Sequence, residues 1–330
     1  MSAVAILGTG AWATALANVL LENKNRVYMW GIDAKEVSAL KKGENPKYFV
    51  HQKLVKSVDL VTLDIKEVLK HKPAFILLAV PSNFIAETLK LCIKNLDFQP
   101  IIINVAKGLD QKTNDIWSKS IKSIVGHKAK GVVTLIGPSF AHEVICGYPT
   151  MLNAVSANIN DAKQVAKLFN NSHFKCIEIT DEIGAEIMGA LKNVMAIAMG
   201  IAYELHTSIN TRAAMLAQAT KEISNIVKLY GGKNETLTQF CGVGDIYLTC
   251  TDEKSRNFSF GKQIANEGMT KALKDNVHTT VEGYRTAKVI FQVIKKNHIS
   301  SPVFNELCQV LFNQHSIKDF VKNVMSEIIE

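Results

Sequence analysis

The sequence predicts an α/β protein whose N-terminal part is a mostly parallel sheet and whose C-terminal part is all helical. Two observations support this prediction. From Ala3 to about Thr180, short β-branched runs alternate with amphipathic or polar stretches, as in strands joined by crossover helices. After Asp181, apolar residues recur at helical spacing and no further convincing strand follows. We therefore expect two domains, residues 1–181 and residues 182–330.

The expected strands are short apolar runs rich in β-branched residues. In chain order they are Ala3–Leu7, Arg26–Trp30, Leu60–Leu63, Ala74–Val80, Ile101–Val105, Val132–Ile136, Met151–Val155 and Lys175–Ile179. A helix is expected after the first strand, over Thr14–Leu21. The acidic pair Asp181–Glu182 is a favourable start for a long helix, because negative charge stabilises a helix N-terminus.

The composition is that of a folded chain with a large core. It has 330 residues, of which 47% are hydrophobic. We find no basic segment at the N-terminus and no apolar run near the roughly 20 residues that a membrane helix needs. We therefore expect a soluble, cytoplasmic protein without membrane insertion. Six scattered cysteines without a C-x-x-C pair indicate reduced, buried thiols, and argue against a disulfide framework or a metal site.

The net charge of +8 is compatible with nucleic-acid binding, but it suits equally an enzyme that attracts anionic cofactors and substrates. The lysines decide between these readings only weakly. They are spread along the chain and form no long run or patch interleaved with aromatic residues. We therefore expect no nucleic-acid partner.

A glycine-rich turn, Gly8-Thr9-Gly10-Ala11-Trp12-Ala13, follows the first expected strand and leads into the first expected helix. In the Rossmann fingerprint the first glycine permits a tight turn and the second lets a pyrophosphate approach the backbone. The third small residue lets helix and strand pack closely. The phosphates then lie at the positive end of a helix. The first domain is therefore predicted to be a Rossmann-type dinucleotide-binding domain.

The residues after the second expected strand bear on the choice of dinucleotide. That strand ends at Trp30, and Gly31-Ile32-Asp33 follow. An acid here accepts hydrogen bonds from the ribose hydroxyls of NAD, whereas a basic residue favours the 2′-phosphate of NADP. Asp33 fits the first role, but it fits equally well as the N-cap of the next helix. On these residues alone NAD is slightly favoured.

Two lysines are notable for their surroundings. Lys192 lies in a helix that is apolar on almost every side, so we expect protein around it. A buried lysine is paired, deprotonated or functional; the alternative is an ammonium that reaches out of the helix to the surface. Lys107 closes a strand, and open α/β sheets bind ligands at the carboxyl ends of their strands. The alternative for Lys107 is a solvated loop lysine.

Polar residues also gather in two later segments. If Asp245–Thr251 is helical, Asp245 and Thr249 lie one turn apart on the same face. The alternative is a helix-start aspartate followed by a surface threonine. Ser255 can cap a helix that begins at Arg256, and free backbone N–H groups beside a forked guanidinium form a natural phosphate site. The alternative for Arg256 is a surface salt bridge.

Seven segments, in order along nearly the whole chain, carry specific polar or glycine residues. They are Gly8–Ala13, Asn104–Leu109, Gly137–Glu143, Leu191–Val194, Gly242–Thr251, Ser255–Asn257 and Val281–Gly283. Together they resemble the NAD(P)-dependent glycerol-3-phosphate dehydrogenase family, in particular its bacterial cytoplasmic branch. The resemblance implies reversible reduction of dihydroxyacetone phosphate to sn-glycerol 3-phosphate, a phosphorylated substrate that supplies the backbone of phospholipids. A homodimer is the general expectation for a soluble oligomer.

The resemblance also implies roles for individual residues. Lys192 would be the proton donor and acceptor, with Lys107, Asp245 and Thr249 as further catalytic residues, and Arg256 and Asn257 would grip the substrate phosphate. The implied substrate-binding residues are Lys107, Gly137, Ser139, Lys192, Asn193, Asp245, Ser255, Arg256 and Asn257. The implied cofactor-binding residues are Gly8, Gly10, Ala11, Trp12, Ala13, Asp33, Lys107, Ala141, Arg256, Val281 and Glu282. Glu282 could instead be a helix-start glutamate.

The chain also departs from the family pattern. Family members often carry Gly at position 13, Ser at 11 and His or Arg at 32, where this chain has Ala13, Ala11 and Ile32. The missing basic side chain at Ile32 puts strong NADP selectivity in doubt, although another lysine or arginine could substitute. The rival functions are a β-hydroxyacid or UDP-sugar dehydrogenase and a cofactor-binding sensor without chemistry. The order of the motifs disfavours the first. The second is disfavoured by the joint presence of four residues, Lys107, Lys192, Asp245 and Arg256.

Overall fold

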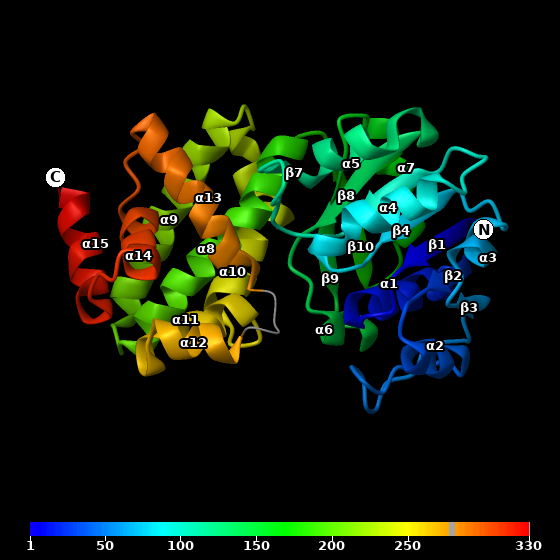
Figure 1. Ribbon diagram of the computed structural model, residues 1–330, viewed down its shortest axis with the longest axis horizontal. Coiled ribbons are helices and arrows are strands. Elements are labelled where there is room, and N and C mark those ends of the chain that lie inside the picture. The colour runs from blue at the N-terminus through cyan, green and yellow to red at the C-terminus, as the bar shows by residue number, and fades with distance from the viewer. Residues whose placement is uncertain (277–280, 330) are drawn as a thin grey trace. The chain divides into compact units, whose positions relative to one another are not determined.

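The computed structural model describes residues 1–276 and 281–329. The contacts within the chain divide it into two compact units. The first unit contains Met1–Ala106 and Asp115–Glu182, and the second contains Lys107–Asn114 and Ile183–Glu330. Figure 1 labels most of the helices and strands of each unit.

The first unit is built on an eight-stranded sheet with the order β10-β9-β8-β5-β4-β1-β2-β3. Its strands are β1 (Ala3–Leu7), β2 (Arg26–Trp30), β3 (Leu60–Thr62), β4 (Phe75–Leu78), β5 (Ile101–Asn104), β8 (Gly131–Ile136), β9 (Thr150–Val155) and β10 (Phe174–Ile179). Neighbouring strands pair in parallel, except that β8 and β9 are antiparallel. The prediction of a mostly parallel sheet is confirmed. Each expected strand is present, with ends that differ by a residue or two.

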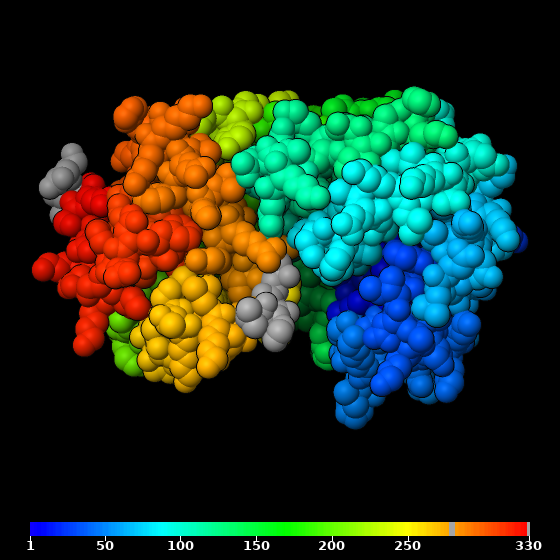
Figure 2. Space-filling view, viewed as in Figure 1, coloured from blue at the N-terminus to red at the C-terminus, as the bar shows by residue number. Residues whose placement is uncertain are grey.

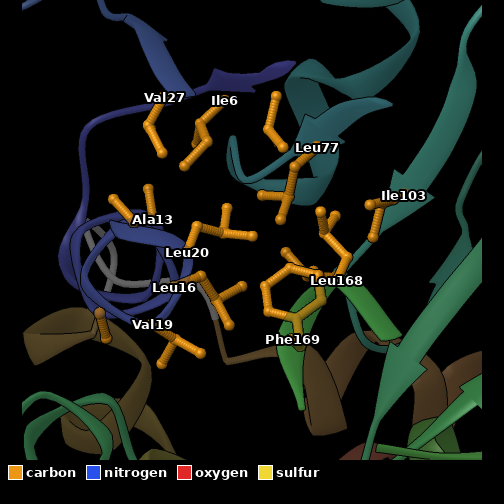
Figure 3. Packing of buried hydrophobic residues seen from close by; sticks show 14 of the residues in the cluster. Ile6, Ala13, Leu16, Val19, Leu20, Val27, Leu77, Ile103, Leu168 and Phe169 are labelled. Atoms are coloured by element: carbon orange, nitrogen blue, oxygen red, sulfur yellow. The ribbon is translucent and has the colours of Figure 1, made fainter. Parts of the chain in front are cut away.

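Helices cover both faces of this sheet, as crossover connections require. One face packs against α1 (Ala11–Glu22), α2 (Ala34–Lys41), α6 (Ala141–Ile145) and α7 (Ile159–Phe169), and the other against α3 (Ile65–Leu69), α4 (Ile85–Ile93) and α5 (Trp117–Val125). Each face has its own hydrophobic core; we call the core under α1, α2, α6 and α7 the first core and the core under α3, α4 and α5 the second core. In β1, the side chains of Val4 and Ile6 lie in the first core and those of Ala5 and Leu7 lie in the second. Figure 3 shows Leu20 of α1 close to Leu77 of β4 in the first core.

The first core fixes the glycine turn, because α1 begins within that turn, at Ala11. In α1 the buried residues run from Ala13 to Leu21 without a gap, so the helix is held on the sheet along most of its length. Ala13 is buried, as expected for the small residue that lets helix and strand approach. The N-terminal end of α1 is therefore held at the carboxyl end of β1, where Rossmann-type sheets bind dinucleotides.

The second unit is helical. Its helices are α8 (Glu182–Glu204), α9 (Ile209–Leu229), α10 (Asp245–Thr251), α11 (Arg256–Glu267), α12 (Met269–Asp275), α13 (Glu282–Asn297), α14 (Pro302–Phe312) and α15 (Phe320–Ile329). The short strand β6 (Leu109–Asp110) belongs to this unit, and β7 (Asp115–Ile116) belongs to the first. Over residues 183–276 and 281–329 the structure contains no strand, which confirms the all-helical prediction for the C-terminal half. Figure 2 shows the surfaces of α12 (yellow) and α15 (red).

Helix α8 is the apolar centre of the second unit. It is long and apolar enough, by length and composition alone, to span a membrane. Its apolar residues do not form one uninterrupted run, because Glu186 and Lys192 lie among them. The apolar window of α8 is entirely buried in the protein, and both charged residues are buried with it.

The cysteines match their expected state with one exception. All six are free thiols, and five of them are buried. Cys146, the C-cap of α6, is only partly buried.

Candidate active site

The glycine turn of the first unit has the shape that a dinucleotide pyrophosphate needs. Gly8 has a φ of +128°, and a Cβ there would lie 2.4 Å from the carbonyl oxygen of Ala79, so only glycine fits. A Cβ at Gly10 would meet nothing within 4 Å, which leaves open space in front of the turn. Gly10 is also the N-cap of α1 and contributes no side-chain cap, so the first N–H groups of α1 are available to phosphate. These residues fit the pyrophosphate.

Ala11 and Trp12 form the first turn of α1 and are partly exposed beside this open space. The other first-unit residues of the predicted site follow β8. Gly137 has a φ of +154°, the hydroxyl of Ser139 donates to its carbonyl oxygen at 3.1 Å, and Ala141 begins α6. Ser139 and Ala141 are partly exposed, which leaves them accessible to a ligand. Their roles toward substrate and cofactor stay predictions.

Asp33 is the N-cap of α2. Its Oδ1 accepts hydrogen bonds from the backbone N–H groups of Lys35, at 2.8 Å, and Glu36, at 3.4 Å. These backbone hydrogen bonds lower the pKa of Asp33, because they favour the charged carboxylate. The capping interpretation is therefore confirmed. The cap does not use Oδ2 of Asp33, which lies 3.4 Å from Nζ of Lys47. The side chain of Asp33 is 39% exposed. Ribose recognition by Asp33 therefore stays a prediction.

Lys192, in the middle of α8, is 1% exposed, which confirms the expectation that protein surrounds it. Its Nζ forms an ion pair with Oδ1 of Asp245 and donates a hydrogen bond to Oγ1 of Thr249 at 3.0 Å. Burial lowers the pKa of Lys192 from its ordinary value of 10.5 to about 7. The charge of Asp245 opposes this shift, and the positive charge of Lys107 adds to it. An ammonium in this setting releases its proton much more readily than a lysine in water.

Asp245 and Thr249 lie on the same face of α10. The helix covers the predicted residues, Asp245–Thr251, and the Oγ1 of Thr249 lies 3.4 Å from Oδ1 of Asp245. The other carboxylate oxygen, Oδ2, is 3.3 Å from Nζ of Lys107. One fully buried carboxylate is thus shared by Lys107 and Lys192. The two ammonium groups carry one positive charge more than Asp245 neutralises, so an anionic ligand would be attracted here.

Lys107 lies three residues after the end of β5. It belongs to the second unit, as the first residue of the segment Lys107–Asn114. Glu282, the first residue of α13, lies in the same electrostatic environment. Burial raises the pKa of Glu282, and the charges of Arg256, Lys107 and Lys192 act against that rise. Lys107, Lys192, Arg256, Asp245 and Glu282 therefore form one charged cluster within the second unit.

Ser255 caps α11 as predicted, because its side chain accepts a hydrogen bond from the N–H of Phe258 at 3.3 Å. Arg256 is the first residue of α11 and is exposed. Asn257 is buried, and its side-chain amide links three helices. Its Nδ2 donates to Oδ1 of Asn193 at 3.1 Å, and its Oδ1 accepts from the N–H of Gly283 at 2.9 Å. Asn257 thus fixes α11 and α13 beside the residue that follows Lys192.

Two contributors to this arrangement were missed by the sequence analysis. A Cβ at Gly283 would lie 2.4 Å from the carbonyl oxygen of Asn193, so the close approach of α13 to α8 requires glycine. The thiol of Cys250, buried in α10, donates to the carbonyl oxygen of Lys192 at 3.6 Å. The sequence signal for Gly283 is its place at the end of the segment Val281–Gly283. Val281, the N-cap of α13, is buried beside it.

The fold and the glycine turn define a class, the Rossmann-type dinucleotide-binding proteins that carry a helical second unit. A family model for the N-terminus of NAD-dependent glycerol-3-phosphate dehydrogenase matches residues 3–162. A second model, for the C-terminus of NAD-dependent glycerol-3-phosphate dehydrogenase, matches residues 181–322. The chain therefore belongs to the NAD-dependent glycerol-3-phosphate dehydrogenase family, as the sequence motifs predicted.

Relatives and solved structures agree with this assignment. The chain is 40% identical over 326 residues to a glycerol-3-phosphate dehydrogenase (NAD(P)+) of Malacoplasma penetrans, covering 98% of this chain and 96% of the relative. It is 36% identical to the enzyme of that name from Bacillus velezensis, covering 99% and 95%. The crystal structure of glycerol-3-phosphate dehydrogenase from Coxiella burnetii matches with a TM-score of 0.88 at 28% identity, covering 98% of both chains.

Proposed function

We propose that the protein catalyses reversible hydride transfer between NAD or NADP and the pair dihydroxyacetone phosphate and sn-glycerol 3-phosphate. The observation that supports this most directly is the buried Lys192, paired with Asp245 and Thr249 in a helical unit of this family. The relatives named above carry that activity in their names. In the cell the reaction would supply glycerol 3-phosphate for phospholipid synthesis. We propose a cytoplasmic homodimer, the commonest symmetric assembly.

In this proposal the two parts of the chain divide the work. Residues 1–181 bind the dinucleotide through the glycine turn and Asp33, and residues 182–330 bind the substrate, with Lys107 contributed from the first range. The dinucleotide, when bound, supplies or accepts the hydride. The roles of Gly137, Ser139 and Ala141 beside these ligands belong to the same proposal.

Lys192 handles the proton. In the reduction direction its ammonium donates a proton to the substrate carbonyl oxygen as that oxygen gains negative charge. In the oxidation direction the neutral amine accepts the hydroxyl proton. A general acid and base works best when its pKa lies near the operating pH, and the lowered pKa of Lys192 satisfies this condition. Asp245 and Thr249 hold the Nζ atom in place through the contacts described above.

The substrate phosphate serves as a remote handle. The guanidinium of Arg256, at the N-terminal end of α11, can hold two phosphate oxygens at once. The backbone N–H groups of that helix end add further donors. Asn257 has two amide hydrogens, of which one goes to Asn193, so it can position the site and also contact the phosphate. Binding energy at the phosphate then orients the carbonyl for hydride transfer.

The test is oxidation of NADH and of NADPH with dihydroxyacetone phosphate, run beside unphosphorylated dihydroxyacetone. We expect turnover with the phosphorylated ketone and very weak turnover with the other. Arg256→Ala should reduce kcat/KM for the phosphorylated ketone by about 100-fold, because a charge-assisted contact is lost, and should leave the unphosphorylated ketone nearly unaffected. Absence of turnover on both cofactors with well-folded protein would refute the proposed function.

A further inference from the structure

The segment that follows β2 carries an acid where Rossmann-type proteins read the adenosine ribose. Asp33 lies about 20 residues after the glycine turn, at the spacing that the fingerprint predicts. The neighbouring Ile32 is 83% exposed and offers no charge to a 2′-phosphate. A cation comes instead from further along the chain. The ammonium of Lys47, in the segment after α2, lies 3.4 Å from Oδ2 of Asp33.

Lys47 is anchored rather than loose. Its Nζ lies 2.5 Å from Oε1 of Glu36, which also accepts the hydroxyl of Tyr48 at 3.1 Å. The side chain of Glu36 is only 7% exposed, whereas that of Lys47 is 55% exposed. An ammonium has three hydrogens. Lys47 can therefore keep Glu36 and still donate outward, next to Asp33.

The same segment is tied to the glycine turn. Oε2 of Glu36 accepts the hydroxyl of Thr9 at 2.5 Å, and Nδ2 of Asn45 donates to the carbonyl oxygen of Thr9 at 2.9 Å. Thr9 lies between Gly8 and Gly10, so these bonds fix the pyrophosphate turn relative to the Asp33–Lys47 pair. Figure 2 shows α2 and the segment after it at the surface of the first unit (blue), where a ligand can reach them.

We propose that the Asp33–Lys47 pair sets the preference between NADH and NADPH in this chain. Asp33 accepts the 2′-hydroxyl of NADH through Oδ2. Lys47 donates to the 2′-phosphate of NADPH and offsets its repulsion by Asp33. Lys47 also pairs with Glu36, so two carboxylates and one ammonium leave a net negative charge, and Lys47 offsets only part of the repulsion on a 2′-phosphate. The pair therefore admits both cofactors. This inference rests on the dinucleotide binding of the proposed function, and not on its substrate.

The test is equilibrium titration of NADH and NADPH by calorimetry, with no ketone present. Lys47→Met should weaken NADPH about tenfold and change NADH by less than about threefold, because only the 2′-phosphate loses a charged partner. Asp33→Ser should act in the opposite direction, strengthening NADPH relative to NADH by about tenfold through loss of repulsion. The two variants thus move the affinity ratio in opposite directions.

Loss of Lys47 leaves Glu36 without its cation, which could disturb the turn. The double variant Lys47→Met with Glu36→Gln removes both charges together and should give the same loss of NADPH affinity relative to NADH. Lys42→Met is the matched control, because it removes the same charge at the far end of α2, and it should leave the ratio unchanged. An unchanged ratio in both Lys47 variants overturns the proposal. So does an equal change in Lys42→Met, or a wild-type protein that binds neither cofactor.

The two proposals can fail separately. A protein that binds NADH and NADPH with the expected dependence on Lys47 but turns over no dihydroxyacetone phosphate would contradict the proposed reaction and retain the Asp33–Lys47 assignment. A protein that turns over dihydroxyacetone phosphate, but whose ratio of NADH to NADPH affinity does not depend on Lys47, would support the proposed reaction and contradict the Asp33–Lys47 assignment.

Discussion

The glycine turn of the first unit and the charged cluster of the second unit are built from different materials. The turn offers backbone N–H groups and open space, with no Cβ at Gly8 or Gly10 and Trp12 as its one large side chain. The cluster offers buried charged side chains, Lys192 and Asp245, that are almost inaccessible to solvent. Backbone groups can bind a cofactor but cannot carry a proton through a reaction. Titratable side chains can, and burial adjusts their pKa.

The difference has an energetic consequence. The turn from Gly8 to Ala13 contains no charged side chain, so it has no buried charge to compensate. A buried charge is costly unless it is paired, and removing one partner leaves the other uncompensated. Substitutions in the cluster should therefore have larger effects than conservative substitutions in the turn.

The largest expected effect is on Lys192. Lys192→Ala should reduce kcat about 10²- to 10⁴-fold, the range for loss of a general acid or base. NADH affinity should stay near the wild-type value, because the glycine turn is untouched. Lys192→Arg is the informative companion, since it keeps a positive charge but cannot release a proton near neutral pH. Steady-state kinetics and calorimetric titration check both variants; near-normal kcat in either would remove Lys192 from the proton transfer.

The second prediction concerns another buried titratable side chain of the second unit, Glu222 of α9. It is 0% exposed and accepts the N–H groups of Val303 and Phe304 at the start of α14, both at 3.0 Å. Burial raises the pKa of Glu222 from its ordinary value of 4.5 to about 7. The folded protein therefore holds this proton more tightly than the unfolded chain does. The contribution of Glu222 to the free energy of unfolding is complete below pH 4.5. It falls by up to about 3 kcal/mol as the pH rises through about 7.

Glu222→Gln should flatten this part of the pH dependence of the free energy of unfolding, because the amide does not titrate. Urea denaturation between pH 5 and 8 measures it. Glu235→Gln is the control, since Glu235 is an exposed acid of the same unit and should leave the slope nearly unchanged. An identical slope in the wild type and in Glu222→Gln would contradict the assigned shift.

The third prediction is the pH dependence of turnover. Because the pKa of Lys192 is lowered to about 7, its ammonium is depleted above that pH. At saturating substrates, kcat for ketone reduction should fall up to about tenfold per pH unit above 7. For alcohol oxidation, kcat should fall by the same factor below 7. Initial rates in both directions from pH 5.5 to 9 test this. Profiles without opposite slopes around neutrality would contradict it.

Local patterns were sufficient to predict much of the molecule. The eight sheet strands, the glycine turn and the caps formed by Asp33 and Ser255 depend on neighbouring residues, so spacing and residue type revealed them. Helix α10 was predicted by the spacing of Asp245 and Thr249 for the same reason.

Contacts between distant segments had no such signal. Asp245 contacts both Lys107, 138 positions before it in the sequence, and Lys192, 53 positions before it. No periodic pattern in the sequence predicts such contacts. Lys47 was missed because its role depends on the chain turning back after α2 toward Asp33. The burial of Lys192 was predictable, since its whole helix is apolar. Its partners were available only from the family resemblance.

The smallest expected effect is in the glycine turn itself. Family members often carry glycine at position 13, where this chain has Ala13, which is 1% exposed in the first turns of α1. Ala13→Gly should lower the free energy of unfolding by about 1 kcal/mol, because glycine loses more backbone entropy in a helix. NADH affinity should change by less than about twofold, since Gly8 and Gly10 already shape the turn. Thermal denaturation and calorimetric titration measure the two quantities. If affinity changed strongly while stability did not, side-chain packing at position 13 would shape the cofactor site, and the contrast between a backbone site and a side-chain site would be weaker than we infer.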